Sequence, residues 1–206
     1  GSFTDERHLA EIRQLTFGGE NAEAYFSPDG RHLVFQATAP GAECDQQFLM
    51  GLAVGEVARV STGRGRTTCG YFDWPEADRV IYSSTHGSSE SCPPAPDHSR
   101  GYVWALYEAY DIYEARMDGS GVRRLTETSG YDAEATWCHR GGRIVFTSAR
   151  DGDLDLYVMD EAGTVGRLTD DPDEGPLVIS SRPELLPEGS VVATDFKALV
   201  LRHVFG

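Results

Sequence analysis

Short runs of alternating hydrophobic and polar residues, separated by glycine and aspartate turns, fill most of the chain. The clearest set contains four runs, at residues 132–137, 143–148, 154–160 and 165–169. Turn residues stand between these runs, at 140–142, 150–153 and 161–163. Runs of this length, rich in β-branched and aromatic residues, predict a four-stranded antiparallel meander. One such sheet cannot bury both faces by itself, so the pattern also predicts neighbouring sheets of the same kind.

The same pattern recurs along the chain. Residues 19–35 align without a gap on residues 130–146, and a weaker copy runs from 70 to 82. The end of the unit recurs as Arg-Gln-Leu-Thr at 13–16, Arg-Val-Ser at 59–61, and Arg-Leu-Thr at 124–126 and 167–169. The four arginines are 46, 65 and 43 residues apart. Four-stranded units with a period of about 40–50 residues are typical of β-propeller blades.

Three stretches resemble the TolB-like β-propeller repeat family. They are Phe26-Ser27-Pro28-Asp29-Gly30-Arg31, then Asp155-Leu156-Tyr157-Val158-Met159-Asp160, then Arg167-Leu168-Thr169. Repeats of this family occur in the Tol-Pal protein TolB and in the propellers of secreted bacterial peptidases. The resemblance implies an all-β fold, a β-propeller of four-stranded antiparallel blades. It implies little about function, because propellers carry many unrelated activities.

We expect one propeller domain over residues 1–206 with about four blades. Three blades are expected at 21–61, 67–126 and 132–169, and the fourth at 175–206 with residues 9–16 as its last strand. Such a strand from the other terminus would remove an exposed sheet edge. Three alternatives stay open: a closed four-bladed ring, a larger ring completed by a second copy, and a chain that ends before its last blades.

The long spacing in the second blade indicates an insertion of about 20 residues at 86–108, between its second and third strands. We expect ligand contacts there from His86, His98, Tyr102 and Trp104. The aromatic residues predict either a contact surface or a local cover over the blade end. The histidines, together with neighbouring carboxylates, could hold a divalent metal, although loop histidines are usually solvated.

Glu23 and Glu134 occupy equivalent positions near the start of the first strand of their blades. In a propeller this strand lines the central channel, so both carboxylates are candidate ligand-binding groups for a cation or an amine. The alternative is ordinary solvated channel lining.

The four cysteines are Cys44, Cys69, Cys92 and Cys138. Cys44 follows the second strand of the first blade and Cys69 precedes the first strand of the next, so both should lie on one face. A disulfide between Cys44 and Cys69 is therefore the preferred pairing, with four free thiols as the alternative.

The acidic turn at Asp151, Asp153 and Asp155 could bind a calcium ion, because alternating carboxylates around a glycine offer hard oxygen ligands. It lacks the downstream glutamate and flanking helices of an EF-hand, and aspartate and glycine are also common hairpin residues.

Composition excludes some classes of protein. A hydrophobic content of 40% is typical of a globular chain rather than a disordered one. The formal net charge of −15 argues against nucleic-acid binding. No apolar run is long enough for a membrane span, and no Gly-x-Ser-x-Gly or His-Glu-x-x-His motif appears. We expect a non-catalytic, exported recognition domain, periplasmic or extracellular, that binds a protein, peptide or glycan. The alternatives are a metal-assisted lyase or hydrolase and a structural subunit that assembles into an oligomer or filament through edge strands.

Overall fold

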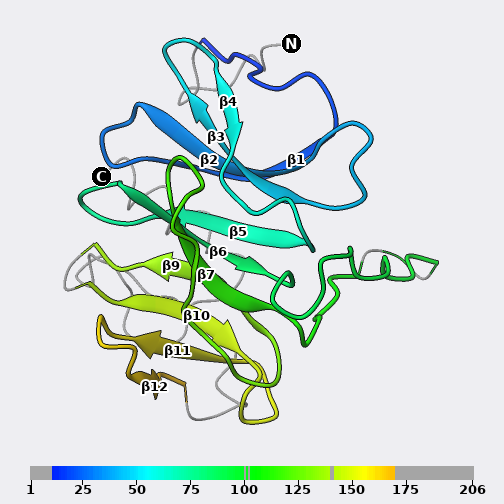
Figure 1. The fold of residues 1–206 in the computed structure, drawn as a ribbon, viewed down its shortest axis with the longest axis vertical. Coiled ribbons are helices and arrows are strands. Elements are labelled where there is room, and N and C mark those ends of the chain that lie inside the picture. Colours follow the sequence, from blue (N-terminus) through cyan, green and yellow to red (C-terminus); the bar gives the residue numbers. More distant parts are fainter. Residues whose placement is uncertain (1–10, 100, 102, 140–141, 170–206) are drawn as a thin grey trace, which may run out of the picture. The chain divides into compact units, whose positions relative to one another are not determined.

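The computed structural model describes residues 11–99, 101, 103–139 and 142–169, which belong to a compact unit spanning Gly1–Asp170. A second unit, Asp171–Gly206, lies outside the described residues. The described residues form three four-stranded sheets that follow one another along the chain (Figure 1). No helix long and apolar enough to cross a bilayer occurs among these residues.

Each sheet is an antiparallel meander whose strands pair in sequence order. The first sheet contains β1 (Glu20–Phe26), β2 (His32–Thr38), β3 (Gln46–Gly51) and β4 (Val57–Arg59). The second contains β5 (Thr67–Phe72), β6 (Arg79–Ser84), β7 (Asp111–Arg116) and β8 (Arg123–Arg124). The third contains β9 (Asp132–Trp137), β10 (Ile144–Ser148), β11 (Asp155–Met159) and β12 (Val165–Arg167). The all-β prediction of four-stranded antiparallel blades is therefore confirmed, and the insertion joins β6 to β7 as expected.

The predicted fourth blade at 175–206 lies outside the described residues. Of its expected partner segment at 9–16, residues 11–16 are described, and they form no strand. Leu15 instead packs against a cluster of Leu33, Phe35 and Met50 on the first sheet. An apolar side chain thus covers part of that sheet face, and completion of the last blade by this segment stays a prediction.

The hydrophobic core lies between successive sheets because the strands alternate their side chains between two faces. In β6, Val80 and Tyr82 belong to the cluster shared with the first sheet, whereas Ile81 belongs to the cluster shared with the third. All three side chains are fully buried. Burial on both faces of the sheet explains why three consecutive residues of β6 are apolar.

The recurring Arg-x-Thr/Ser ending has a structural role in each sheet, which we call the outer-strand contact. In the third sheet, Thr169 Oγ1 accepts the backbone N–H of Leu156 at 3.0 Å and donates to Asp155 Oδ1 at 2.8 Å. Arg167 Nη2 donates to Asp155 Oδ2 at 2.5 Å. Asp155 is only 8% exposed. The motif therefore bonds the short outer strand to a buried carboxylate at the start of the third strand.

We expect Asp155→Ala to destabilise the chain by about 1.5–3 kcal/mol, because it removes a buried acceptor that is bonded to a charged group and a hydroxyl. Urea unfolding measures this change. Asp153→Ala is the matched control, since Asp153 is exposed in the same turn, and it should change stability by less than about 0.5 kcal/mol. Equal midpoints for the two variants would contradict this role of Asp155.

The turn after the first strand is capped at the same repeat position in each sheet. The backbone N–H groups of Ser27, Asp73 and Cys138 donate across the turn to His32, Arg79 and Arg143. Asp73 also accepts the backbone N–H of Arg79 at Oδ1, at 3.0 Å. Burial raises the pKa of Asp73 to about 6, and a hydrogen bond and the charge of Asp78 also raise it, against the Arg79 backbone hydrogen bond, which lowers it. The ionised Asp73 is thus disfavoured in the folded state.

Asp73→Asn should be at least as stable as the natural chain at pH 8, because the amide oxygen can still accept the Arg79 N–H without carrying a buried charge. A raised carboxyl pKa means that the folded state takes up its proton before the unfolded state does as pH falls. The advantage of the variant should therefore shrink from about pH 6 to about pH 4. Denaturant unfolding of both proteins across this range measures the difference, and a natural chain that is the more stable at pH 8 would refute the idea.

Candidate binding site at the inner strands and the insertion

The first strand of every described sheet carries a bulge at the same repeat position. The pairing register shifts between Ala22 and Tyr25 in β1, between Thr68 and Tyr71 in β5, and opposite Val145 to Thr147 in β9. A residue with positive φ occupies each bulge: Glu23 at 49°, Cys69 at 52° and Glu134 at 59°. Left-handed backbone costs a non-glycine residue roughly 1–2 kcal/mol. Such strain tends to persist where the surrounding structure fixes a functional side chain.

Glu134 is held by hydrogen bonds that reach the insertion. Tyr131 Oη donates to Glu134 Oε1 at 3.3 Å, and Thr147 Oγ1 donates to Oε2 at 2.7 Å. Trp104 Nε1, from the insertion, in turn donates to Tyr131 Oη at 3.2 Å. Two residues predicted separately as ligand-binding, Glu134 and Trp104, are therefore linked through one buried tyrosine that the sequence did not single out.

In the second sheet, Cys69 occupies the bulge position that Glu23 and Glu134 occupy in the first and third sheets. Its side chain is 8% exposed. Burial raises the pKa of this thiol, and the charges of Glu23 and Glu134 raise it further, against a hydrogen bond with Thr68 that lowers it. Cys69 is thus a neutral thiol at physiological pH. The two glutamates and the thiol form an electrostatically negative inner-strand cluster.

A groove of about 390 Å³ lies at the strand ends that carry the β2–β3 and β6–β7 loops. One wall comes from the first two sheets and includes Asp45 and Arg66. The other wall comes from the insertion and includes His98, Trp104 and Tyr107. We call it the insertion groove. Its volume falls in the range of small-ligand sites.

The charged groups of the groove wall use only part of their hydrogen-bonding capacity. Arg66 Nη1 lies 3.6 Å from Asp45 Oδ2, and the Arg66 guanidinium sits 6.0 Å from the centre of the Tyr107 ring. Arg66 Nε is buried and has no hydrogen-bond partner in the described part of the chain. Thr38 Oγ1 donates to the other Asp45 oxygen. The groove therefore offers an unused guanidinium donor beside an engaged carboxylate.

The insertion also presents apolar surface to solvent. Val103, Trp104 and Leu106 are 44%, 40% and 48% exposed. Tyr110, in contrast, is buried and packs edge-on against Tyr131 at 5.7 Å. Tyr110 therefore covers the sheet end, whereas Trp104 remains accessible and its role in a contact surface stays a prediction. Predicted ligand residue Tyr102 lies outside the described residues.

The disulfide joins Cys44 to Cys92, with 6.0 Å between the two Cα atoms. The predicted pairing of Cys44 with Cys69 is therefore wrong. The prediction placed Cys69 in a loop before its strand, but Cys69 is the third residue of β5 and its side chain is buried there. The observed bond ties the insertion of the second sheet to the β2–β3 loop of the first, so it helps to shape the insertion groove.

His86 and His98, which were predicted to flank one site, contact different residues. His86 Nδ1 pairs with Ser84 Oγ at 2.7 Å, and the ring packs 4.1 Å from the ring of Tyr113. Burial, aided by the charges of Arg64 and Arg124, lowers the pKa of His86. His98 lines the insertion groove. No group of three or more metal-ligating side chains occurs among the described residues, so the predicted histidine metal site does not assemble there.

The carboxylates of Asp151, Asp153 and Asp155, considered as calcium ligands, do not form a cation site among the described residues either. Asp155 is engaged by Arg167 and Thr169, and Asp151 accepts the hydroxyl of Tyr157 at 2.5 Å. Asp153 is exposed. These carboxylates hold a hairpin and the outer strand, which corresponds to the structural alternative for this turn.

The structure resembles several solved propellers, whereas no family model matches the sequence. TolB from Agrobacterium tumefaciens gives a TM-score of 0.56 at 20% identity, over 74% of this chain and 50% of that protein. TolB from Acinetobacter baumannii gives 0.58 at 24% identity, over 75% and 34%. The chain has a TolB-like β-propeller fold. A nidogen/laminin complex also matches, with a TM-score of 0.51 at 13% identity over 72% and 48%. The chain thus spans half or less of the length of these propeller proteins.

Removing the disulfide should loosen the insertion of this TolB-like domain. The bond closes a sequence separation of 48 residues, and a loop of this length corresponds to about 4 kcal/mol of stabilisation in the chain-entropy treatment. We expect faster limited proteolysis within residues 85–110 in a Cys44→Ser, Cys92→Ser double variant. Cys69→Ser should leave that rate unchanged. Peptide mapping without reduction that links Cys44 to Cys69 would contradict the assignment.

Proposed function

We propose that the chain is an exported recognition domain that binds an extended peptide segment of a partner protein in the insertion groove. The observation that carries the proposal is that one groove is lined by Arg66, whose buried Nε has no hydrogen-bond partner among the described residues, and by Trp104, which is 40% exposed. A buried donor without a partner is costly, so a peptide carbonyl or carboxylate that accepts from it would add binding free energy. Trp and Arg are the side chains that most often dominate such interfaces.

The shape and chemistry of the groove favour a peptide over a glycan. Its insertion wall includes aliphatic Val103, which is 44% exposed, as well as Trp104, and aliphatic side chains of a peptide could pack against them. The groove also holds both signs of charge, Arg66 and Asp45, which matches a backbone that offers acceptors and donors in alternation. The nidogen/laminin complex is one case of this fold in a protein–protein assembly.

Export of the domain is part of the proposal. A disulfide that connects two loops at the site supports an oxidising compartment, because such bonds form and persist there. The bond holds Cys92 at the β2–β3 loop before the ligand arrives, so less conformational entropy is lost on binding.

Selection of peptides from a displayed random library, followed by titration of the best sequence, tests the proposal. We expect Arg66→Ala and Trp104→Ala each to weaken binding by about tenfold or more, which corresponds to about 1.4 kcal/mol. Val54→Ser is the matched control, because Val54 is 73% exposed and lies in the β3–β4 turn at the other strand end. Selected peptides that bind all three variants equally would overturn the insertion groove as the site.

A further inference from the structure

A second cavity lies at the opposite strand ends from the insertion groove. It has a volume of about 700 Å³. Residues of three turns line it: 73–76 of the β5–β6 turn, His139, Gly142 and Arg143 of the β9–β10 turn, and 160–162 of the β11–β12 turn. We call it the turn cleft. Antiparallel meanders place these turns at one end and the long β6–β7 insertion at the other, and none of the described residues of the insertion lines the cleft.

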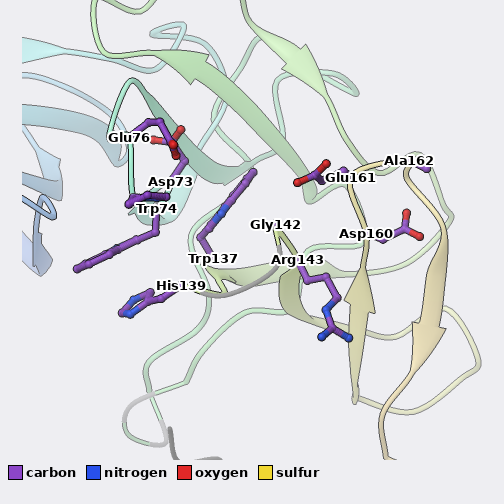
Figure 2. A pocket seen from close by; sticks show the side chains of 11 residues that line it. Asp73, Trp74, Glu76, Trp137, His139, Gly142, Arg143, Asp160, Glu161 and Ala162 are labelled. Atoms are coloured by element: carbon purple, nitrogen blue, oxygen red, sulfur yellow. The ribbon is translucent and has the colours of Figure 1, made fainter.

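Aromatic rings form one side of the turn cleft. The rings of Trp74 and His139 stack with centroids 3.8 Å apart and planes inclined by 18°. Tyr71 Oη lies 3.4 Å from His139 Nε2. Figure 2 shows Trp137 between this stack and the carboxylates of the third sheet. Both Trp74 and Trp137 line the cavity, and their indole nitrogens are buried without partners in the described chain.

Four carboxylates also line the cleft. Asp73, Glu76, Asp160 and Glu161 face a single arginine, Arg143, among the lining residues. Glu161 lies directly over Gly142, where an added Cβ would come 2.0 Å from Glu161 Oε1. Only glycine allows this approach, and Gly142 also has a φ of 57°. The backbone thus makes room for the Glu161 carboxylate at the edge of the cleft.

Asp73 is the most informative of these groups. It is 93% buried, with 7% of its surface exposed. Its Oδ1 accepts the backbone N–H of Arg79 at 3.0 Å, and its carboxyl is also hydrogen-bonded to the side chain of Asp78. The Arg79 guanidinium lies near Asp78 and Glu114. No arginine or lysine side chain of the described residues forms an ion pair with Asp73. The guanidinium near this carboxyl pair, that of Arg79, contacts Asp78 and Glu114 and lowers the pKa of Asp73 without forming an ion pair with it. An ammonium ligand would therefore add positive charge beside the buried Asp73 and its neighbour Asp78.

We propose that the turn cleft binds an organic ammonium group between the rings of Trp74 and Trp137 and the carboxylate of Asp73. A cation over the face of an indole is attracted by the ring quadrupole, and aromatic cages flanked by acids recognise methylated or primary ammonium groups in this way. The proposal concerns a different strand end and a different ligand from the peptide site. The ammonium could belong to a small choline-like molecule or to a lysine side chain of a larger partner, and the test separates these sources.

Tryptophan fluorescence of the full chain provides the test. The chain has three tryptophans, Trp74, Trp104 and Trp137, so a Trp104→Phe background leaves only the two cleft indoles as reporters. Choline chloride, at constant ionic strength, should give a saturable change below about 10 mM. The neutral isostere 3,3-dimethylbutan-1-ol should not. A lysine-containing hexapeptide is the second probe, with its alanine counterpart as control, and a response to it but not to choline assigns the ammonium to a peptide side chain.

Substitutions complete the test. In the same background Asp73→Asn should weaken the response to the effective probe by about tenfold, because it removes the charge but keeps the Arg79 hydrogen bond. The matched control is Asp118→Asn, since Asp118 is an exposed turn residue outside the cleft. Indole N–H resonances of Trp74 and Trp137 that move with the probe, in a spectrum that otherwise retains its dispersion, confirm binding to a folded cleft. The proposal is overturned if neither ammonium probe gives a saturable change, if the isostere acts as choline does, or if Asp73→Asn binds as tightly as the control.

Discussion

The outer-strand contact is the interaction on which each sheet depends. The fourth strands are very short, with three residues in β4 and β12 and two in β8. A backbone ladder of this length contributes few hydrogen bonds, and a short edge strand would fray without further support. Side chains provide that support in all three sheets. Ser61, Thr126 and Thr169 each accept the N–H of the second residue in the third strand, at 2.9–3.0 Å.

The chemistry of this contact differs between the sheets. In the second and third sheets the third strand begins with a buried aspartate, Asp111 or Asp155, which pairs with Arg124 or Arg167. In the first sheet Gln46 replaces the aspartate and accepts from Ser61 at 2.8 Å. Its amide then donates to the carbonyl of Gly65 at 2.7 Å, in the segment that leads to β5. The neutral version thus connects two sheets, whereas the ionic versions act within one.

Much of the fold follows from the sequence because the repeats align on one another. The alignment that places Glu23 on Glu134 also places the turns and the Arg-x-Thr/Ser endings, so three sheets and the β6–β7 insertion can be predicted. The bulges cannot, because glycine usually marks left-handed backbone and here glutamate and cysteine occupy it. The same omission produced the wrong disulfide: Cys69 was assigned to a loop, although it is a bulge residue inside β5. The turn cleft was also missed, since Trp74 and Trp137 belong to different repeats and meet only when the sheets pack.

The two candidate sites differ in how their geometry is fixed, and this determines how far they can influence one another. The insertion groove depends on a long loop held by one covalent bond, whereas the turn cleft depends on short turns held by backbone hydrogen bonds. Six-residue strands such as β5 separate the two ends, which corresponds to about 20 Å at 3.3 Å per residue. This exceeds the Debye length of about 8 Å at physiological ionic strength. An ammonium group in the cleft would therefore exert little electrostatic effect on Arg66. Any coupling between the sites has to pass through the packed sheets, whose buried, tightly packed cores resist small displacements.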